Sequence, residues 1–331
     1  MTQKPFSILL SSAGRRVALL RILRRTLSDL GLEGRVVAVD TSALAAAFQL
    51  ADRAFVVPRC TSPDFVPAVL GICRANDIRL VVPTIDTELP IYAAARQEFA
   101  AEGIVVAVST PEVVEIGADK VRTHEWLVAN GFPAVRQALP EAVLAHPEEW
   151  PFPLMAKPRR GSSSVGAGVV RSQTQLREVA GTGGFVVETI APGSEYTIDI
   201  VADRAGGCLC AVPRRRLEVR GGEVSKGVTV RSDRMEVLAG DICASLPGAY
   251  GALNLQAFHD EATGDVRVIE LNPRFGGGFP LTWEAGAKFP QWTIEEILGL
   301  PVTARSRSWR DGLVMLRYDE AVFVRSEGLP G

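Results

Sequence analysis

The chain has 331 residues, of which 47% are apolar and 22% are charged, so it is long enough for two or three domains and can bury a core. Its 36 basic and 38 acidic residues nearly cancel, which gives no electrostatic reason to expect nucleic acid or an anionic membrane as a partner. No uncharged apolar run approaches 18 residues and the N-terminus lacks the apolar region of a signal peptide, so we expect a cytoplasmic protein.

The cysteine and histidine content disfavours several classes of enzyme. Five cysteines occur without a CxxC pair, as expected of reduced core residues in a cytoplasmic protein. Only three histidines are present and none is paired at ligand spacing, so a structural zinc site is not expected. A Ser-His-Asp hydrolase is disfavoured as well, because no GxSxG sequence occurs.

Short apolar runs alternate with helical segments over the first third of the chain. We expect strands over 6–11, 35–40, 54–58, 80–83 and 104–108, and helices over 15–30, 64–76 and 88–102. This alternation predicts an α/β, Rossmann-like domain with a parallel sheet over residues 1–114. The first turn, 11–16, has one glycine rather than three, so dinucleotide binding is disfavoured and Asp40 is interpreted as structural.

The remainder of the chain predicts an α+β architecture with antiparallel sheets, divided into regions 115–187 and 188–331. Helices are expected over 119–130 and 233–246, with Pro-rich irregular structure after the first of them. Strands are expected over 154–157, 165–170, 185–188, 195–201, 208–213, 222–230, 253–259 and 266–271. A last hairpin is expected from strands 313–318 and 321–324, turning at Asp319.

A lysine leads into a loop of glycines and serines after residue 156. The chain has 31 Arg but only 5 Lys, and Lys157 closes an apolar run just before this loop. Glycine lets backbone N–H groups approach an anion and serine adds donors, which indicates a phosphate-clamping hairpin rather than a P-loop. An ordinary flexible hairpin is the alternative. The loop residues concerned are Gly161, Ser162, Ser163, Ser164 and Gly166.

Oxygen-bearing side chains gather on two neighbouring predicted strands near the C-terminal third. Glu270 and Asn272 are two residues apart and therefore share a strand face, which Gln256 can join by cross-strand pairing. Such ligands suit magnesium, and Arg274 adds a cation on the same side. A polar strand end at the surface is the alternative. A third group, 188–197, is a strand–turn–strand hinge with Glu188 and Glu195 at its edges.

These three groups, in this order, resemble the ATP-grasp superfamily. The resemblance runs from about Asp119 to Asp319, and the preceding domain is similar to the one before the ATP-grasp domains of carbamoyl phosphate synthetase, biotin carboxylase and D-alanine–D-alanine ligase. Small carbamoyl-phosphate-synthetase-like proteins also carry the sequence SSAGRR, found here at 11–16. The resemblance implies an ATP-grasp fold of two α+β subdomains, a lid subdomain at 115–187 and a metal-binding subdomain at 188–331.

The resemblance also implies roles for individual residues. Lys120 and Lys157 would reach the phosphates of ATP, and the loop from Gly161 would be a mobile lid. Adenine would bind at the hinge and ribose at Glu195, the hinge residues being Glu188, Thr189, Ile190 and Ala191. Magnesium, as two ions and with manganese as an alternative, would be held by Gln256, Glu270 and Asn272.

Catalysis and substrate binding are assigned to fewer residues. Arg274 resembles the arginine that steadies the transferred phosphoryl group, and Lys226 or one of 214–216 supplies a further cation near the γ-phosphate. Asp86 and Glu88 follow a parallel strand, where they either bind an amino group of the acceptor or serve the start of the next helix. Gly277 and Gly278 are expected to shape the acceptor pocket.

The resemblance implies an ATP-dependent carboxylate–amine ligase that works through an acyl phosphate and releases ADP and phosphate. Its partners would be small carboxylate and amine substrates of amino-acid type, with a homodimer as the assembly. An enzyme that phosphorylates bicarbonate or carbamate is one alternative, and a non-catalytic nucleotide-binding regulator is another. An oxidoreductase is disfavoured by the missing glycine fingerprint.

Overall fold

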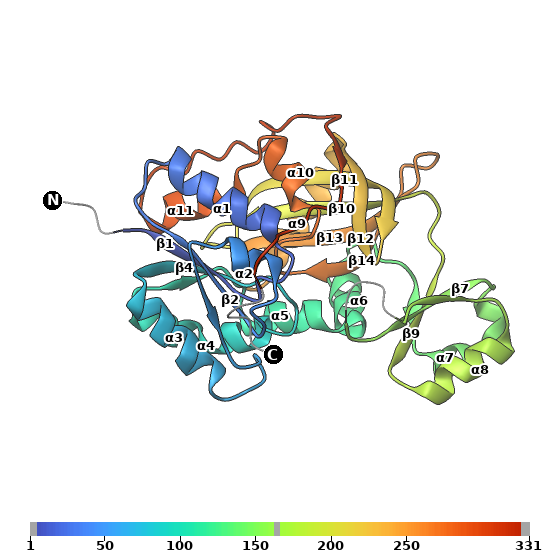
Figure 1. Cartoon of the computed structure of the whole chain (residues 1–331). Helices are drawn as coiled ribbons and strands as arrows, with labels where there is room; N and C mark the ends of the chain where they lie inside the picture. The colour runs from blue at the N-terminus through green and yellow to red at the C-terminus, as the bar shows by residue number, and fades with distance from the viewer. Residues whose placement is uncertain (1–4, 162–165, 326–331) are drawn as a thin grey trace.

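The computed structural model describes residues 5–161 and 166–325. Three sheets organise the chain (Figure 1). The first is five-stranded and parallel, in the order β3-β2-β1-β4-β5 of a doubly wound sheet. Its strands are β1 (Ser7–Leu10), β2 (Val36–Asp40), β3 (Arg53–Val56), β4 (Ile78–Val82) and β5 (Val105–Val106). The predicted Rossmann-like domain is confirmed.

Helices connect these strands and continue beyond the sheet. They are α1 (Val17–Asp29), α2 (Ala46–Leu50), α3 (Phe65–Ala75), α4 (Leu89–Ala101), α5 (Pro111–Ala118) and α6 (Lys120–Ala129). The helix α5 runs through residue 114, where the sequence placed the end of the first domain. Asp40 accepts a hydrogen bond from the N–H of Gly14 at 2.8 Å, so its carboxylate fixes the first turn, as the structural interpretation predicts.

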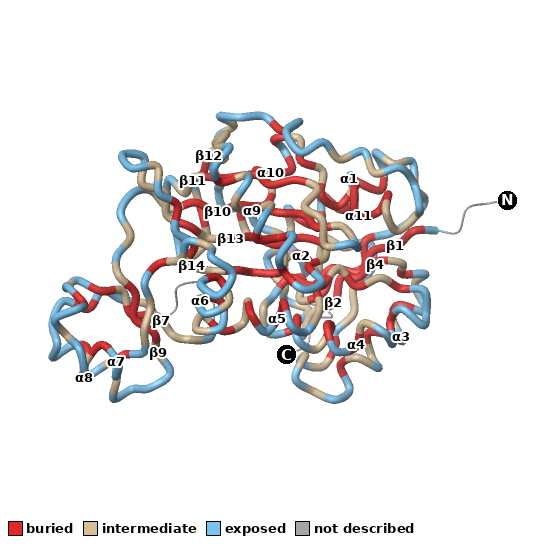
Figure 2. Tube along the Cα trace, turned by 180° about the vertical axis from the view of Figure 1, so that it is seen from behind, coloured by how far each residue is buried: buried red, intermediate tan, exposed pale blue. Residues whose placement is uncertain are grey.

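The second sheet is a small antiparallel unit that projects from the rest of the molecule (Figure 1). Its strand order is β6-β9-β7-β8, and α7 and α8 cover it. The elements are β6 (Gln137–Ala138), α7 (Pro140–Ala145), η1 (Pro147–Glu149), β7 (Leu154–Pro158), β8 (Gly168–Val170), α8 (Gln173–Thr182) and β9 (Phe185–Thr189). This unit has its own apolar core, which includes Trp150, Leu154 and Leu176, while its outer surface is largely exposed (Figure 2).

The third sheet has six strands in the order β14-β13-β10-β11-β12-β15, every neighbouring pair antiparallel. Its elements are β10 (Ser194–Ala202), β11 (Cys208–Arg220), β12 (Glu223–Thr229), α9 (Asp233–Ser245), β13 (Gly251–His259), β14 (Val266–Asn272) and β15 (Val314–Leu316). Two further helices, α10 (Phe279–Glu284) and α11 (Phe289–Ile297), follow β14. The predicted α+β part with antiparallel sheets is confirmed.

Two local predictions are wrong. The last hairpin does not form, because β15 pairs with β12 at the edge of the six-stranded sheet and residues 321–324 form no strand. The predicted helices do not include α2, α5, α7, α8, α10 and α11. These helices are only five to ten residues long, and four of them carry a proline at their start, so the helical period is short and interrupted.

The first domain and the six-stranded sheet share one apolar core. Helix α1 packs against α10 and α11, and Leu20 and Leu23 of α1 belong to the same buried cluster as Phe279 and Phe289. Figure 1 shows these three helices side by side. This contact holds the first turn of the chain, immediately before α1, against the segment that follows β14. In the described part of the chain, no helix has the length and apolarity needed to cross a membrane.

Candidate functional site

A pocket of about 440 Å³ lies between the small sheet and the six-stranded sheet, and we call it the inter-sheet pocket. Strands β7, β8 and β9 form one wall, and β13 and β14 form the other. Ten residues that the sequence singled out line it, namely Lys120, Lys157, Gly161, Glu188, Thr189, Ile190, Ala191, Glu195, Gln256 and Glu270. Gly166 is not among its lining residues, and Ser162, Ser163 and Ser164 lie outside the described residues.

Lys157 is held by a buried carboxylate. Its ammonium lies 2.6 Å from Glu188, whose side chain is only 3% exposed. Glu188 also accepts a hydrogen bond from the amide of Gln137 at 3.0 Å. The Glu188 carboxylate therefore orients the Lys157 side chain by an ion pair between β9 and β7. A nucleobase bound in the pocket would contact a Glu188 that is already salt-bridged.

Lys120 joins the two walls of the pocket. It is the first residue of α6, whose N-cap Asp119 accepts a hydrogen bond from Val121. The Lys120 ammonium donates to the backbone carbonyl of Gly161 at 2.9 Å and lies 3.9 Å from Glu270. Asp119 is buried and also pairs with Arg159 at 2.8 Å, so the start of α6 is tied to the strand end that enters the loop.

The predicted oxygen set forms where β13 and β14 pair. Gln256 is the register partner of Glu270, and Asn272 is the partner of Asn254. The predicted cross-strand pairing is therefore confirmed. Burial raises the pKa of Glu270, whereas the nearby Lys120 and Lys157 lower it. One carboxylate and two amide oxygens on adjacent strands suit a magnesium ion, which takes a few protein oxygens together with phosphate and water.

A smaller cavity of about 70 Å³ adjoins this set, and we call it the arginine cleft. Gln256 and Glu270 line both cavities. Four guanidinium groups face the cleft from the first turn, β11 and the end of β14, those of Arg16, Arg214, Arg216 and Arg274. Such a concentration of cations beside oxygen ligands is a strong attractor for phosphate or carboxylate groups.

Arg214 is fully buried and only partly paired. Its Nε and Nη2 donate to Asp199 at 2.7 and 3.0 Å, and Thr282 donates to the same carboxylate. Its Nη1 has no hydrogen-bond acceptor within the described residues. A Cβ at Gly278 would overlap this nitrogen, so glycine is required there. The Nη1 group of Arg214 is therefore a fixed donor that can hydrogen-bond an anion in the cleft.

Arg216 offers a second donor of the same kind. Its side chain is 8% exposed, and its Nε lies 3.4 Å from Glu195 without hydrogen-bond geometry. Arg214 and Arg216 were sequence alternatives to Lys226, and they line the cleft. Arg214 and Arg216 are therefore better candidates than Lys226 for the phosphate-binding cation. The Lys226 ammonium binds Glu218 at 2.6 Å on the exposed side of β12, away from both cavities.

Asp86 binds Arg274. Its two carboxylate oxygens accept from Nε and Nη2 of Arg274 at 2.5 and 2.7 Å. This bidentate pair links the first domain to the end of β14 and fixes the guanidinium beside Asn272. This pairing with a nearly buried cation favours a structural role for Asp86, and its binding of an amino group stays a prediction.

Glu88 is structural, which corrects its assignment to the substrate. It is completely buried, and its oxygens accept four hydrogen bonds, from the hydroxyls of Ser11 and Ser12 and the N–H groups of Thr84 and Ile85. Burial raises its pKa, and these donors oppose the rise. Glu88 therefore binds the first turn to the end of β4. Glu88 immediately precedes α4, as the alternative expects, but its side chain makes no capping hydrogen bond to that helix.

Gly277 and Gly278 line the arginine cleft, together with residues that sequence reasoning missed. Arg16, Glu223 and Asn254 come from segments far apart in the chain, so no local spacing connects them. The only signal for Arg16 was the SSAGRR sequence, which was used for the resemblance and not for the site.

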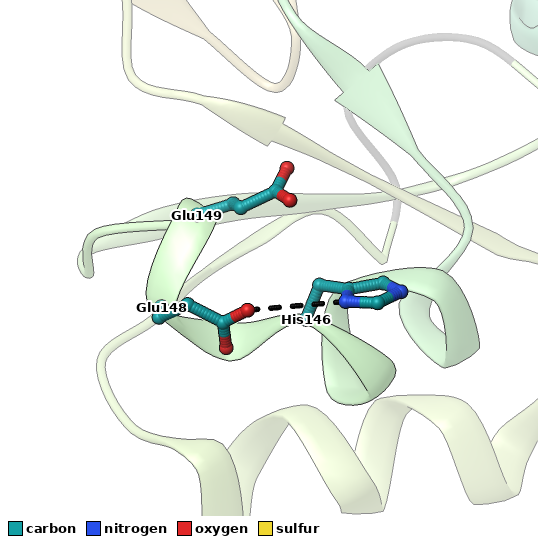
Figure 3. A group of neighbouring side chains, drawn as sticks. All are labelled: His146, Glu148 and Glu149. Carbon is teal, nitrogen blue, oxygen red and sulfur yellow. Dashed lines mark ion pairs between the residues drawn. The ribbon is translucent and has the colours of Figure 1, made fainter.

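One further cluster of ligand-type side chains lies in the small unit. His146, Glu148 and Glu149 have ligand atoms within 4.8 Å of one another, and all three are exposed (Figure 3). His146 lies 3.8 Å from Glu148, and Glu149 pairs with Arg136 at 2.9 Å. These are ordinary surface ion pairs, and we assign no metal to them.

Two parts of the chain match models of known protein families. Residues 8–107 match the model of a PylC-like N-terminal domain. Residues 184–321 match the model of an ATP-grasp domain in the biosynthetic pathway with the Ter operon.

Individual relatives match most of this chain at low sequence identity. A formate-dependent phosphoribosylglycinamide formyltransferase of a Synechococcus species is 28% identical over 81% of this chain and 70% of its own. A carbamoyl phosphate synthase large chain of Kocuria rhizophila is 22% identical over 82% of this chain. The chain spans only about a quarter of that relative, 27% of its length.

Solved structures share the whole fold. The biotin carboxylase domain of the Hydrogenobacter thermophilus 2-oxoglutarate carboxylase, in complex with MgADP, ADP and bicarbonate, superposes with a TM-score of 0.72 at 18% identity, covering 94% of this chain and 74% of its own. The N5-carboxyaminoimidazole ribonucleotide synthetase of Thermus thermophilus gives 0.69 at 20% identity, covering 90% and 80%.

Proposed function

Because the chain belongs to the ATP-grasp superfamily, we propose that it is an ATP-dependent ligase that joins a carboxylic acid to an amine. The acid would be activated as an acyl phosphate, and ADP and phosphate would be released. The observation that carries this proposal is the junction of the two cavities. Gln256 and Glu270 line both, so a nucleotide in the inter-sheet pocket directs its terminal phosphate toward four arginines.

The nucleotide would be held by both walls of the inter-sheet pocket. Backbone groups of 188–191 would bind adenine, Glu195 the ribose, and Lys120 and Lys157 the phosphates. Gln256, Glu270 and Asn272 would hold magnesium, with manganese as an alternative. When bound, the ion offsets negative charge on the phosphates.

The arginine cleft would stabilise charge on the transferred group. Arg214 and Arg216 each have one buried nitrogen without a hydrogen-bond acceptor in the described part of the chain. Asp199, which itself accepts from Thr282, fixes Arg214 in advance, so this donor needs no reorganisation when negative charge develops. Asp86 fixes Arg274 in the same way, beside Asn272.

A carboxylating enzyme is the second candidate. The arginine cleft measures only about 70 Å³, a size that suits a small anion such as bicarbonate. A binding-only regulator is disfavoured, because it has no need for an oxygen ligand set and four arginines around a terminal phosphate. The expected partners are small carboxylates and amines, and the expected assembly is a homodimer, which light scattering would test.

The deciding experiment measures ADP release with magnesium–ATP. Carboxylic acids and amines are supplied singly and in pairs, and bicarbonate is supplied in parallel with each amine. A ligase releases ADP fastest with one acid–amine pair and forms their amide, detected by mass spectrometry. Stimulation by bicarbonate alone would replace the ligase with the carboxylating enzyme, and the absence of stimulation by any of them would contradict both.

A further inference from the structure

A third cavity, of about 280 Å³, lies between the first domain and the segment after β14, and we call it the domain-boundary pocket. Its size is near the lower end for small-molecule sites. It shares Arg16, Glu223, Gly276 and Gly277 with the arginine cleft, so the two cavities adjoin along these residues. None of the sequence-predicted substrate carboxylates lines it, although Gly277 does.

The pocket carries an excess of positive charge. Arg15, Arg16 and Arg317 contribute to its lining, and Glu223 is the one carboxylate among its lining residues. Glu223 lies between two of them, 3.0 Å from Arg317 and 3.4 Å from Arg16. Burial lowers the pKa of Arg16, and Glu223 offsets this only in part. Three guanidinium groups against one carboxylate leave room for a second anion.

The first turn fixes the backbone from which Arg15 and Arg16 extend. Ser12 and Gly14 both have a left-handed backbone, with φ of 46° and 44°. The hydroxyl of Ser12 donates to Glu88 at 2.7 Å, and the N–H of Gly14 donates to Asp40 at 2.8 Å. Because the buried Glu88 and the half-buried Asp40 hold this uncommon turn, and Glu223 pairs with the side chain of Arg16, Arg16 is positioned before any ligand arrives.

Part of the pocket lining is apolar. Leu19, Phe275, Phe279 and Met315 form this apolar wall, and none of their side chains offers a strong hydrogen-bonding group. The rings of Phe275 and Phe279 pack edge to face with centroids 4.6 Å apart. Sugar hydroxyls placed along this wall would lose their hydrogen bonds to water without replacement, whereas an aliphatic or aromatic body would not.

We propose that the domain-boundary pocket binds the acid substrate, a carboxylic acid with an aliphatic or aromatic body. Arg16, which lines both cavities, holds the carboxylate where the pocket adjoins the arginine cleft, and the body packs on Phe275, Phe279 and Met315. The assignment rests on the proposed ligase function and deepens it by naming the substrate class. It separates this chain from enzymes whose acceptor is a sugar phosphate.

Binding is measured by calorimetry on the full chain, with and without magnesium–ADP. The probes are 3-phenylpropionate, its neutral amide 3-phenylpropionamide, and ribose 5-phosphate. We expect the acid to bind about tenfold more tightly than the amide, because only the acid forms charge-assisted hydrogen bonds. Ribose 5-phosphate is expected to bind more weakly than the acid, because its hydroxyls would lose hydrogen bonds to water along the apolar wall. Equal binding of acid and amide, tight binding of ribose 5-phosphate, or no binding of the acid would each overturn the proposal.

Two sets of variants locate the site. Arg16→Gln should weaken the acid about tenfold or more, and Arg16→Lys should weaken it less. On the edge strand β15, Met315→Glu should weaken the acid while Met315→Lys should not, a difference that loss of folding cannot produce. Arg21→Gln is the matched control, since Arg21 lies on α1, which follows Arg16, but pairs with Glu320 and lines neither cavity. Identical affinities in Met315→Glu and Met315→Lys would overturn the assignment.

The proposal and the ligase function can fail separately. If the acid binds and responds to the variants but no acid stimulates ADP release, the pocket stands and the ligase function fails. If an acid stimulates ADP release with an unchanged KM in both Met315→Glu and Arg16→Gln, the ligase function stands and the pocket assignment fails.

Discussion

The inter-sheet pocket and the domain-boundary pocket are assembled in different ways. The first takes its residues from neighbouring strands, where pairing such as Gln256 with Glu270 is set by strand period and register. The second takes Glu223 and Arg317 from the paired strands β12 and β15 and their ends, and Arg16 reaches them from the first domain because α1 packs on α10 and α11. Local spacing can therefore reveal the first pocket, whereas the second exists only after the domains have packed.

The largest expected effect is on catalysis, from a substitution in the inter-sheet pocket. Glu270→Gln removes the one carboxylate of the predicted metal set and should lower ADP release about a hundredfold or more, because the amide carries no charge to bind the ion. Thermal unfolding should stay close to that of the wild type. Glu218→Gln is the control, since Glu218 is an exposed carboxylate of the same sheet. Near-normal turnover of Glu270→Gln at all magnesium concentrations would contradict the metal assignment.

The Asp86–Arg274 pair tests how the two regions are joined. Asp86→Asn leaves Arg274, with 12% of its side chain exposed, without its bidentate partner, which should cost about 2–3 kcal/mol of stability. Because Arg274 would then move, kcat should fall by a similar factor with every amine tested. Denaturant unfolding and steady-state kinetics give the two values. A change confined to the KM of the amine would instead restore Asp86 as an amine-binding residue.

Lys157 tests whether the inter-sheet pocket needs a compact cation. Lys157→Ala removes the ammonium that Glu188 orients and should weaken nucleotide binding by about 1–3 kcal/mol. Lys157→Arg keeps the charge but is longer and planar, so it should weaken binding as well. The affinity for ADP is measured by calorimetry, with Lys226→Ala and Lys226→Arg as matched controls. Equal affinities across the Lys157 series would show that this lysine does not bind the nucleotide.

Glu88 tests the support of the first turn. Glu88→Gln places an amide N–H₂ where four donors converge, so it should lower the free energy of unfolding by about 1–2 kcal/mol. Affinity for ADP should not change, because the side chain is buried away from the inter-sheet pocket. A variant with wild-type stability and weakened substrate binding would return Glu88 to the substrate site.

The sequence predicts features that depend on local spacing, and it does not predict those that depend on the packing of the domains. The alternation of apolar runs predicts the parallel sheet, and the spacing of Glu270 and Asn272 predicts a shared strand face. The sequence does not predict which group a carboxylate binds. Asp86 and Glu88 are two residues apart after the same strand, yet one binds Arg274 across the domain boundary and the other is buried under the first turn. Only the packing of the domains distinguishes them.

The sequence also does not show whether Lys226, Arg214 or Arg216 faces the arginine cleft. Lys226, Arg214 and Arg216 all lie on the hairpin of β11 and β12, and in a strand the direction of each side chain depends on its position. Without knowing where the register shifts between 216 and 219 fall, the sequence does not tell which of these cations faces the cleft. The structure turns Arg214 and Arg216 toward the cleft and Lys226 toward solvent.

The smallest expected effect is therefore at Lys226. Its pair with Glu218 is half-exposed, and such surface pairs contribute little, so Lys226→Ala should change the free energy of unfolding by less than about 0.5 kcal/mol. The rate of ADP release should stay within about twofold of the wild type, whereas Arg216→Ala, on the neighbouring strand but lining the cleft, should lower it strongly. Assaying the two variants side by side under saturating magnesium–ATP compares cations that the sequence could not rank. A larger loss in Lys226→Ala than in Arg216→Ala would mean that β12 turns this lysine toward the phosphates during turnover.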